Sequence, residues 1–491
     1  MKLKIFRSLI VLSILAFSTL PVVSQAKPAG KVNQSPQVTP PNTAGNVINT
    51  YMPLVNRGRP APPNVGPASI GSEMYGGQDP TIMSRARGAK IRWTRVSGLD
   101  WKAIEPVRTN PPTYNWSSVD EASIQAMTAN EIKVIAMVRY APSWAQKYPG
   151  VSCGPIAENA LDAFAQFMSA AVTKYSKAPY GIHYWEIGNE PDVDYTLVAP
   201  NSEFGCWGDE NDAYYGGGYF AMMLEKVYPA IKAADPSATV MPGGLLLDCD
   251  PTHPPAGKTC KPANFLEGIL RNNGKMNGGN YFDMVSFHGY PVYNGTMQLD
   301  EHYPSWESRG GVVLGKANFI REILAKYNVS KPLFHSEGSL TCPEYFTNVC
   351  NPPGQDFYEA QADYVVWLYI RNWAADIKMT TWFQFIDGWR YDGLLDSAWN
   401  PKPSYNALRF LTTELGLMSY NKQITTYAPL RTYEFTSSSK KIWVIWSPDE
   451  QSHPFALPVG TLNVYDKYGS SITPVNNEIS IESPVYVEIT P

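Results

Sequence analysis

The sequence predicts an α/β protein in which a (β/α)8 TIM barrel is followed by a small C-terminal β-sandwich. Three observations support this fold class. From about residue 68, short apolar segments alternate with amphipathic ones, which is typical of βα units and a parallel sheet. Eight such pairs can be counted, and this number favours a closed barrel over an open sheet. After about residue 420 only strand-like segments follow.

Residues 1–26 have the pattern of a signal peptide. The apolar segment Leu9–Leu20 follows a positively charged start and precedes small residues at Ser24–Ala26. This segment is short for a membrane span, and no other candidate span is found. We therefore expect a secreted protein, extracellular or in the cell envelope, with no membrane association once the signal peptide is removed.

The barrel is expected over residues 67–418, after a Pro- and Asn-rich linker at 27–66. Apolar residues recur every three or four positions between Leu161 and Tyr175, which predicts a helix there. Similar patterns predict helices around Phe319–Leu324 and Tyr364–Trp373. The predicted strands are Ala68–Met74, Ile91–Val96, Lys133–Val138, Ile182–Ile187, Thr239–Gly243, Met284–His288, Leu333–Glu337 and Thr380–Phe385.

The β-sandwich is expected over residues 419–491, after a helix at about Ser404–Leu415. One of its strands, Lys441–Trp446, is apolar on both faces, whereas the others alternate. We expect a structural accessory domain, with carbohydrate binding as the alternative. The remaining predicted strands are Thr432–Phe435, Leu462–Tyr465, Glu478–Ile481 and Val485–Ile489.

Composition excludes several classes of function. The formal net charge is −4 and no basic surface is implied, so nucleic acid is not an expected partner. No Gly-rich phosphate-binding loop follows a strand, which argues against a nucleotide-binding α/β fold. No metal-type spacing of Cys or His is found, so we expect neither a metal nor a cofactor. Aromatic residues make up 13% of the chain, which suits stacking on sugar rings.

Six cysteines in an exported chain indicate disulfides. Proximity in the sequence favours Cys249–Cys260 and Cys342–Cys350, and this leaves Cys153 with Cys206. Fifteen pairings are formally open for six cysteines.

A strand end with adjacent polar side chains is the strongest functional signal. The apolar segment Ile182–Ile187 is broken at Gly188, and Asn189 and Glu190 follow before Pro191 turns the chain away from helix. A carboxylic acid beside a fixed hydrogen-bonding partner is well placed for proton transfer. The alternative for an isolated Asn-Glu-Pro is a capping pair in a surface turn.

The full run Trp185–Pro191 resembles the acid/base motif of the clan A glycoside hydrolases, which are (β/α)8 barrels that cleave sugars with retention of anomeric configuration. Glu337 ends the seventh predicted strand and resembles the nucleophile of that clan. The resemblance implies that Glu190 is the acid/base and that Glu337 is the nucleophile. The alternative for Glu337 alone is a capping or ion-pairing residue.

The same resemblance implies substrate-binding roles for neighbouring residues. Asn189 resembles the asparagine that binds the sugar 2-hydroxyl. Arg95 resembles a second-strand arginine that keeps the nucleophile ionised, and Arg92 competes for that place. His288 and Tyr290 resemble a sixth-strand pair near the glutamates, and the alternative for His288 is a buried histidine bonded to backbone.

Further positions are less closely matched. Trp382 resembles the aromatic platform of the eighth strand, with barrel core as its alternative. Many clan members have a histidine at the end of the third strand; here Arg139 and Tyr140 are expected to fill that space, and Trp144 to line a subsite. His335, two residues before the candidate nucleophile, is expected to share its face of the strand.

Within the clan, the chain is most similar to glycoside hydrolase family 39. The segments Leu99–Pro106, Gly393–Asp396 and Lys402–Ala407 carry this resemblance. The family contains β-xylosidases, α-L-iduronidases and endo-acting enzymes on exopolysaccharides, and the sequence does not choose among them. We expect a secreted O-glycosyl hydrolase that cleaves a polysaccharide or oligosaccharide by double displacement. The alternatives are a transglycosylase with the same two glutamates and a non-catalytic carbohydrate-binding or cell-surface protein.

Overall fold

A computed structural model describes residue 66 and residues 69–491. The predicted signal peptide at 1–26, and the linker at 27–66 apart from its last residue, lie outside the described residues and stay predictions. The described residues belong to one compact unit. None of their helices combines the length and the hydrophobicity that a membrane crossing requires.

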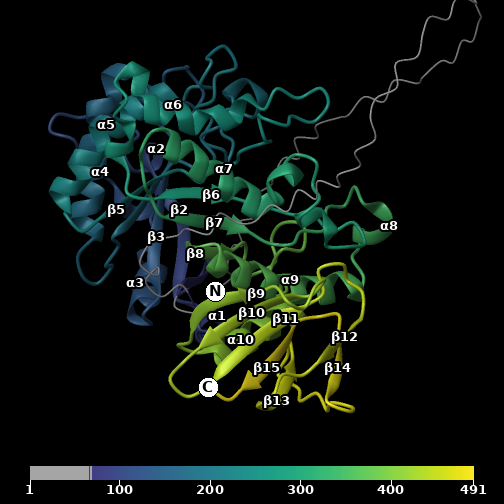
Figure 1. Cartoon of the computed structure of the whole chain (residues 1–491). Coiled ribbons are helices and arrows are strands. Elements are labelled where there is room, and N and C mark those ends of the chain that lie inside the picture. The colour runs from purple at the N-terminus through teal and green to yellow at the C-terminus, as the bar shows by residue number, and fades with distance from the viewer. Residues whose placement is uncertain (1–65, 67–68) are drawn as a thin grey trace, which may run out of the picture. The chain divides into compact units, whose positions relative to one another are not determined.

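Eight parallel strands form the barrel, in the order β5-β4-β3-β2-β1-β8-β7-β6 (Figure 1). Between β5 and β6, one further parallel pair joins Leu245 to Phe287. Leu245 N donates to Ser286 O at 3.0 Å, and His288 N donates to Leu245 O at 2.9 Å. The predicted barrel is therefore confirmed. The strands are β1 (Ile70–Ser72), β2 (Trp93–Asp100), β3 (Lys133–Arg139), β4 (Tyr184–Ile187), β5 (Thr239–Pro242), β6 (Val285–His288), β7 (Leu333–Gly338) and β8 (Ile377–Trp382).

Strand β8 begins and ends three residues before the predicted Thr380–Phe385. The chain leaves the sheet after Trp382, and Phe385 is buried in the loop that follows. Phe385 N donates to the carbonyl of Glu73 at 2.9 Å. Its apolar side chain continues the strand pattern in the sequence, although its backbone is no longer in the strand.

Helices surround the barrel and bury faces with helical spacing. In α4 the buried set includes Leu161, Phe164, Met168 and Tyr175, as the sequence pattern predicts. Helix α1 begins at Pro80, where the Asp79 carboxylate accepts from Thr81 N at 2.8 Å. The helices are α1 (Pro80–Gly88), α2 (Trp101–Ile104), α3 (Glu121–Ala129), α4 (Leu161–Tyr175), α5 (Gly217–Ala234), α6 (Phe265–Arg271), α7 (Val312–Lys326), α8 (Thr347–Cys350), α9 (Gln355–Ala374) and α10 (Pro403–Leu415).

The inside of the barrel changes from apolar to charged along the strands. Residues two positions apart in a strand point to the same side. Arg95 lies two residues after an apolar interior residue in β2, and Glu186 holds the corresponding place in β4. Charged side chains thus lie toward the carboxyl ends of the strands, where active sites of such barrels are found. The apolar cluster contains Trp93, Ile135, Met241, Met284, Phe334 and Met379.

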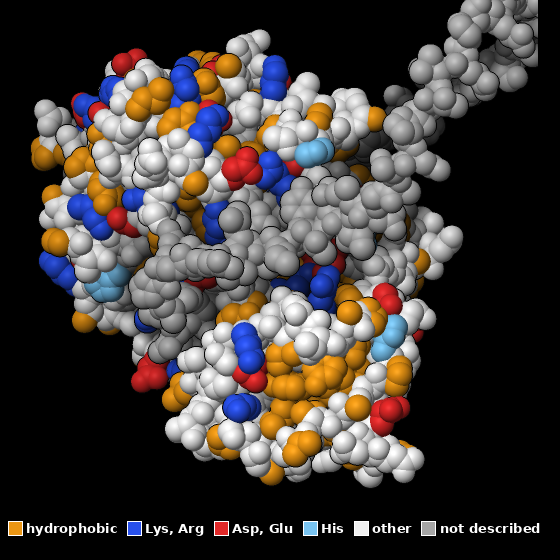
Figure 2. Space-filling model, in the orientation of Figure 1, with side chains coloured by type: hydrophobic (Ala, Val, Ile, Leu, Met, Phe, Trp, Pro, Cys, Tyr) orange, Lys and Arg blue, Asp and Glu red, His pale blue; other side chains and the backbone are white. Residues whose placement is uncertain are grey.

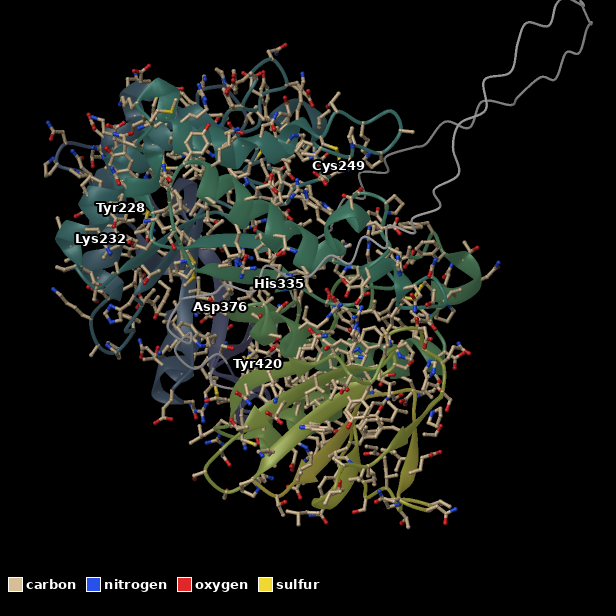
Figure 3. The ribbon with its side chains drawn as sticks, in the orientation of Figure 1. Tyr228, Lys232, Cys249, His335, Asp376 and Tyr420 are labelled. Atoms are coloured by element: carbon tan, nitrogen blue, oxygen red, sulfur yellow. A yellow bond between two sulfur atoms is a disulfide. The ribbon has the colours of Figure 1, made fainter. Side chains whose placement is uncertain are left out.

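A β-bulge in β7 changes which side chains face inward. Phe287 pairs with His335, but His288 pairs with Glu337, so β7 contains one extra residue. The His335 ring, labelled in Figure 3, stacks on Phe287 with centroids 5.0 Å apart, and its Nδ1 lies 3.1 Å from Asn372 of α9. Glu337 points inward instead. The prediction that His335 and Glu337 share a face is wrong, because the bulge breaks the two-residue alternation.

The C-terminal strands form the predicted β-sandwich, with a five-stranded antiparallel sheet and a two-stranded one. Strand β11 is buried on both faces, as its sequence predicts: Trp446 stacks on Trp367 of α9 at 5.8 Å, and Ile445 lies in a separate cluster with Val487. Hydrophobic side chains gather over these strands on the face shown in Figure 2. The strands are β9 (Ser419–Ile424), β10 (Arg431–Thr436), β11 (Lys441–Trp446), β12 (His453–Ala456), β13 (Thr461–Asp466), β14 (Glu478–Ile481) and β15 (Val485–Ile489).

Three disulfides join the pairs that sequence proximity favours. They link Cys153 to Cys206, Cys249 to Cys260 and Cys342 to Cys350. Each involves loops that follow strands at their carboxyl ends. They therefore constrain the loops on the side of the barrel where the charged residues lie.

Candidate active site

Glu190 is held in the turn that follows β4. Gly188 and Glu190 both have left-handed backbone, with φ of +87° and +47°. Glu190 N donates to Gly244 O at 3.0 Å, which fixes the turn against the end of β5. The Glu190 side chain is buried, and its Oε1 lies 2.8 Å from His288 Nδ1. Left-handed backbone in a non-glycine residue is costly, and it persists where the surrounding structure holds it.

Glu337 reaches the same place from β7. Its carboxylate accepts hydrogen bonds from Arg95 Nη1 and from the Tyr290 hydroxyl. His288 Nδ1 lies 3.3 Å from Glu337 Oε2. His288 thus stands between the two glutamates, and ligand atoms of all three side chains lie within 4.8 Å of one another.

Arg95 connects three carboxylates, two in strands β4 and β7 and one on the residue that follows β1. Its guanidinium donates to Glu186 and Glu337, and to Glu73 at 3.2 Å. Its Nη2 donates to Asn189 Oδ1 at 2.5 Å. Arg92, the competing candidate, is half-exposed and pairs with Glu131 instead. Of the two arginines, Arg95 is therefore the one that reaches the glutamates.

Burial shifts the titration of these groups. It raises the pKa of Glu190 to about 7, while the positive charges of Lys316 and Arg95 lower it. Burial also raises the pKa of Glu337, against the opposite effects of His288 and Arg95. Burial lowers the pKa of His288 to about 4, so its imidazole is neutral at pH 7. The site therefore contains the Glu337 carboxyl, in contact with the Arg95 guanidinium, and the Glu190 carboxyl, which titrates near neutral pH.

Sequence reasoning missed four buried charges around these residues. Glu73 directly follows β1, and Glu186 lies in β4 inside the motif Trp185–Pro191. Lys316 of α7 donates to Leu246 O at 2.5 Å and to His288 O at 2.9 Å. Asp192 accepts from the backbone N–H groups of residues 246 and 247. Of these four residues, only Glu186 could have been predicted from the sequence. It lies two positions before Gly188 in the same extended segment, and residues two apart in a strand point to the same side.

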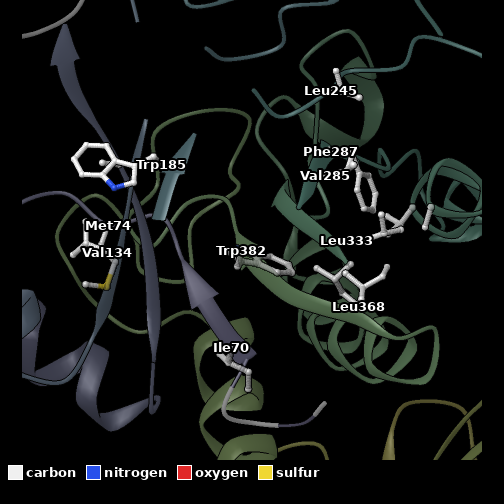
Figure 4. Packing of buried hydrophobic residues seen from close by; sticks show 14 of the residues in the cluster. Ile70, Met74, Val134, Trp185, Leu245, Val285, Phe287, Leu333, Leu368 and Trp382 are labelled. Carbon is white, nitrogen blue, oxygen red and sulfur yellow. The ribbon is translucent and has the colours of Figure 1, made fainter. Parts of the chain in front are cut away.

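Two predicted sugar-binding residues lie elsewhere. Trp382 has no exposed surface, and its indole N–H donates to Asp392 O at 2.8 Å; Figure 4 shows it among core residues. The alternative interpretation of Trp382, a residue of the barrel core, therefore describes its position better than an aromatic platform for the sugar does. Trp144 packs on Trp101 and donates to Glu105 O at 3.1 Å. Among the described residues, no hydrogen bond or ring contact joins Trp144 to Glu190 or Glu337, because Trp144 lies in the loop after β3 and packs on Trp101 of α2.

The end of β3 is occupied as expected by Arg139 and Tyr140. Arg139 pairs with Glu203 and its guanidinium lies 4.7 Å from the centre of the Tyr140 ring. Asn189 Nδ2 donates to Glu203 O at 3.0 Å. These contacts bring the β3 end into the same hydrogen-bonded network as Asn189.

The grouped ligand atoms of Glu190, His288 and Glu337 raise the question of a metal ion. Arg95 and Tyr290 already donate to the Glu337 carboxylate. A guanidinium in direct contact with a carboxylate opposes a second cation there. A further grouping contains Asp248 with Cys249 and Cys260, but these two cysteines form a disulfide. The donor set therefore suits proton transfer better than metal binding.

The fold is that of the glycoside hydrolases found among similar solved structures. No protein-family model matches the chain, and no curated protein matches it in sequence. A family 39 glycoside hydrolase from Bacteroides cellulosilyticus WH2 aligns with a TM-score of 0.64 and 17% identity, over 87% of this chain and 81% of that one.

Two further structures extend this likeness. A monomeric β-xylosidase from Caulobacter crescentus CB15 aligns with a TM-score of 0.54 and 15% identity, over 87% of this chain and 96% of that one. A family 51 α-L-arabinofuranosidase from Bifidobacterium longum has a TM-score of 0.55 and 12% identity, with coverage of 87% and 96%. At these identities the likeness describes the fold, and it agrees with the resemblance to clan A and to family 39.

Proposed function

We propose that the protein is an exported, retaining glycoside hydrolase that cleaves O-glycosidic bonds in a polysaccharide or oligosaccharide. The observation that carries the proposal is the meeting of Glu190 and Glu337 at His288, with ligand atoms of the three within 4.8 Å of one another. Carboxyl groups about 5–5.5 Å apart are typical of retaining enzymes, and inverting enzymes need roughly 6.5–9.5 Å. The three disulfides favour an oxidising compartment and so support export.

In the first step, a Glu337 carboxylate oxygen attacks the anomeric carbon. The bond to the leaving oxygen breaks, and Glu190 gives that oxygen its proton. Arg95 and Tyr290 donate to Glu337, so they hold its carboxylate and favour its ionised form. The raised pKa of Glu190, about 7, keeps it protonated for this role near neutral pH.

In the second step, Glu190 removes a proton from water, whose oxygen attacks the anomeric carbon of the glycosyl ester. The ester bond to Glu337 breaks, and the sugar leaves with its original configuration. Esterification removes the negative charge of Glu337, which lowers the proton affinity of Glu190 and suits its change from acid to base. Asn189, fixed by Arg95 and Glu203, is placed to bind the sugar 2-hydroxyl with its remaining N–H.

The experiment is release of reducing ends from a panel of xylans, glucans, mannans, galactans, uronic-acid polymers and bacterial exopolysaccharides. Glu190→Gln and Glu337→Gln are compared with the wild type. Glu131→Gln is the matched control, because Glu131 is an exposed glutamate paired with Arg92. Loss of the general acid should reduce the rate about 10²–10⁴-fold, and loss of the nucleophile at least as much. Equal release by wild type and either active-site variant would contradict the proposal.

A further inference from the structure

A second group of side chains lies close to Glu337, on the loops that follow β7 and β8. The Arg390 guanidinium lies 4.3 Å from the centre of the Trp389 ring and 5.8 Å from that of Tyr345. Trp389 meets the Tyr290 ring edge-on at 5.3 Å, and the Tyr290 hydroxyl donates to Glu337. A single tyrosine therefore connects this aromatic group to the proposed nucleophile.

Arg390 has no acidic partner within the described part of the chain, and its electrostatic neighbours are Tyr345 and Tyr303. It is partly buried, and burial lowers its pKa. A cation that has lost solvent without gaining a counter-charge is unfavourable, and an anionic ligand would relieve this cost. Several other arginines have carboxylate partners: Arg139 pairs with Glu203, Arg309 with Asp250 and Arg431 with Glu301.

The loop that carries Arg390 is fixed in an unfavourable backbone conformation. Arg390 and Tyr391 follow each other with φ of +51° and +60°, in the left-handed region. Cys342 N donates to Arg390 O at 3.0 Å, and Tyr391 O accepts from Gln361 at 2.9 Å and Lys402 at 2.8 Å. Surrounding structure thus holds the backbone of Arg390 in place, and the side chain is presented from a fixed loop.

We propose that Trp389, Arg390 and Tyr345 form a subsite for a carboxylate-bearing sugar next to the cleaved bond. The planar guanidinium matches a carboxylate with two parallel hydrogen bonds. Tyr345, 64% exposed, offers a ring face to the sugar. The inference rests on the proposed glycosidase function and names its substrate class, a polysaccharide that contains uronic acid.

The test measures binding, so that it does not depend on turnover. Glu190→Gln protein is titrated with glucuronoxylan, polygalacturonate, alginate and hyaluronan, and with the carboxyl-reduced form of each. Arg390→Gln and Arg390→Lys are added to the same background. Arg92→Gln is the matched control, since Arg92 is a partly exposed arginine paired with Glu131. Thermal unfolding of each variant shows whether it is folded.

We expect at least one acidic polymer to bind about tenfold more tightly than its reduced form. Arg390→Gln should remove this preference and leave binding of the reduced form unchanged, and Arg92→Gln should keep it. Arg390→Lys should keep part of the preference for the acidic polymer, because a lysine retains the positive charge but cannot form two parallel hydrogen bonds to a carboxylate. If Arg390→Gln is unstable, the Arg390→Lys variant provides the test. Absence of any preference, or a preference that survives in Arg390→Gln, overturns the subsite. Wild-type release of reducing ends is read separately, so hydrolysis of neutral polymers alone would defeat the subsite and leave the proposed function standing.

Discussion

Arg95 contacts three buried carboxylates, those of Glu73, Glu186 and Glu337, and its own side chain is 1% exposed. A single guanidinium therefore serves three buried carboxyl groups. No hydrogen bond or ion pair joins Glu190 to Arg95 within the described chain, whereas Glu337 is in direct contact with it. The contact with Arg95 favours ionisation of Glu337, against the burial that raises its pKa, whereas burial raises the pKa of Glu190 to about 7.

Replacing Arg95 with methionine should destabilise the protein severely. The change leaves buried carboxylates without their cation, and breaking a buried ion pair in this way costs about 3–5 kcal/mol. The loss should be smaller at pH 4–5 than at pH 8, because Glu337, whose pKa is raised by burial, can then take up a proton. Chemical denaturation at both pH values measures it. Arg92→Met is the control, and its effect should stay within about 1 kcal/mol; a similar effect of the two changes would contradict the role given to Arg95.

Replacing Glu190 with glutamine should raise stability in a pH-dependent way. The folded pKa of Glu190, about 7, lies above its ordinary value of 4.5, so its contribution is most favourable below pH 4.5 and is lost as the pH rises through 7. The variant and the wild type should therefore unfold at similar temperatures at pH 5, and the variant at a higher temperature at pH 8. A gain that is equal at both pH values would show that Glu190 does not titrate near 7.

At the residue scale, sequence motifs predicted the side chains that end strands. Asn189, Glu190, His288, Tyr290 and Glu337 all follow such a pattern, and the structure brings them together. Lys316 was not predicted, because a lysine in an amphipathic helix is usually solvated and nothing in the local sequence shows that it is buried. Likewise Trp382 and Trp144 differ from the expectation because burial of a tryptophan depends on loops distant in sequence.

Helix α7 contributes to the site through the junction of β5 and β6. This junction has only one residue pair in place of a full ladder. Lys316 donates to carbonyls on both sides of it, at Leu246 and at His288. The same ammonium group lowers the pKa of Glu190. A single helix residue therefore links the segment that follows β5 to the end of β6 and lowers the pKa of the proposed acid.

Lys316→Met should move the basic limb of the pH profile of kcat/KM to higher pH. Removing the positive charge raises the pKa of Glu190, so the proton is retained at higher pH. The measurement is kcat/KM between pH 4 and 9 on the polysaccharide that the wild type cleaves. Lys326→Met, at the exposed end of the same helix, should leave the limb in place. An unchanged limb in Lys316→Met would separate this lysine from the titration of Glu190.

The elements themselves were predicted where the hydrophobic period is clear. Strand β11 has apolar residues on both of its faces, and it lies at the centre of its sheet. Strands β9 and β12 were missed, because β9 has no fully buried residue and β12 only one. The bulge in β7 was also missed, because an inserted residue leaves the apolar character of the strand unchanged.

At the scale of the whole molecule, the barrel and the C-terminal sheet share one hydrophobic core. Trp446 and Phe435 of the sheet pack on Trp367 and Trp373 of α9. A buried ion pair between Lys467 and Asp363, at 2.6 Å, crosses the same contact. The sheet thus covers a barrel helix that would otherwise expose tryptophans to water.

Barrel and sheet should therefore unfold together. Trp446→Ala should lower stability by about 3–5 kcal/mol, since it leaves a large cavity against Trp367. A truncated protein that ends at residue 418 should be insoluble, because the tryptophans of α9 that pack on the sheet would be exposed to water. Denaturant unfolding followed by near-ultraviolet circular dichroism and by activity should show a single midpoint for the wild type. Two separate midpoints, or a soluble active protein that ends at 418, would mean that the sheet is an independent domain.

The stereochemistry of the first product tests the central claim most directly. The polysaccharide that releases the most reducing ends is digested in a proton NMR tube, and the anomeric signals are followed before mutarotation. Attack by Glu337 followed by water gives the anomer of the original bond, as the close approach of Glu190 and Glu337 predicts. First appearance of the opposite anomer would mean that water attacks directly, and Glu337 would then not be the nucleophile.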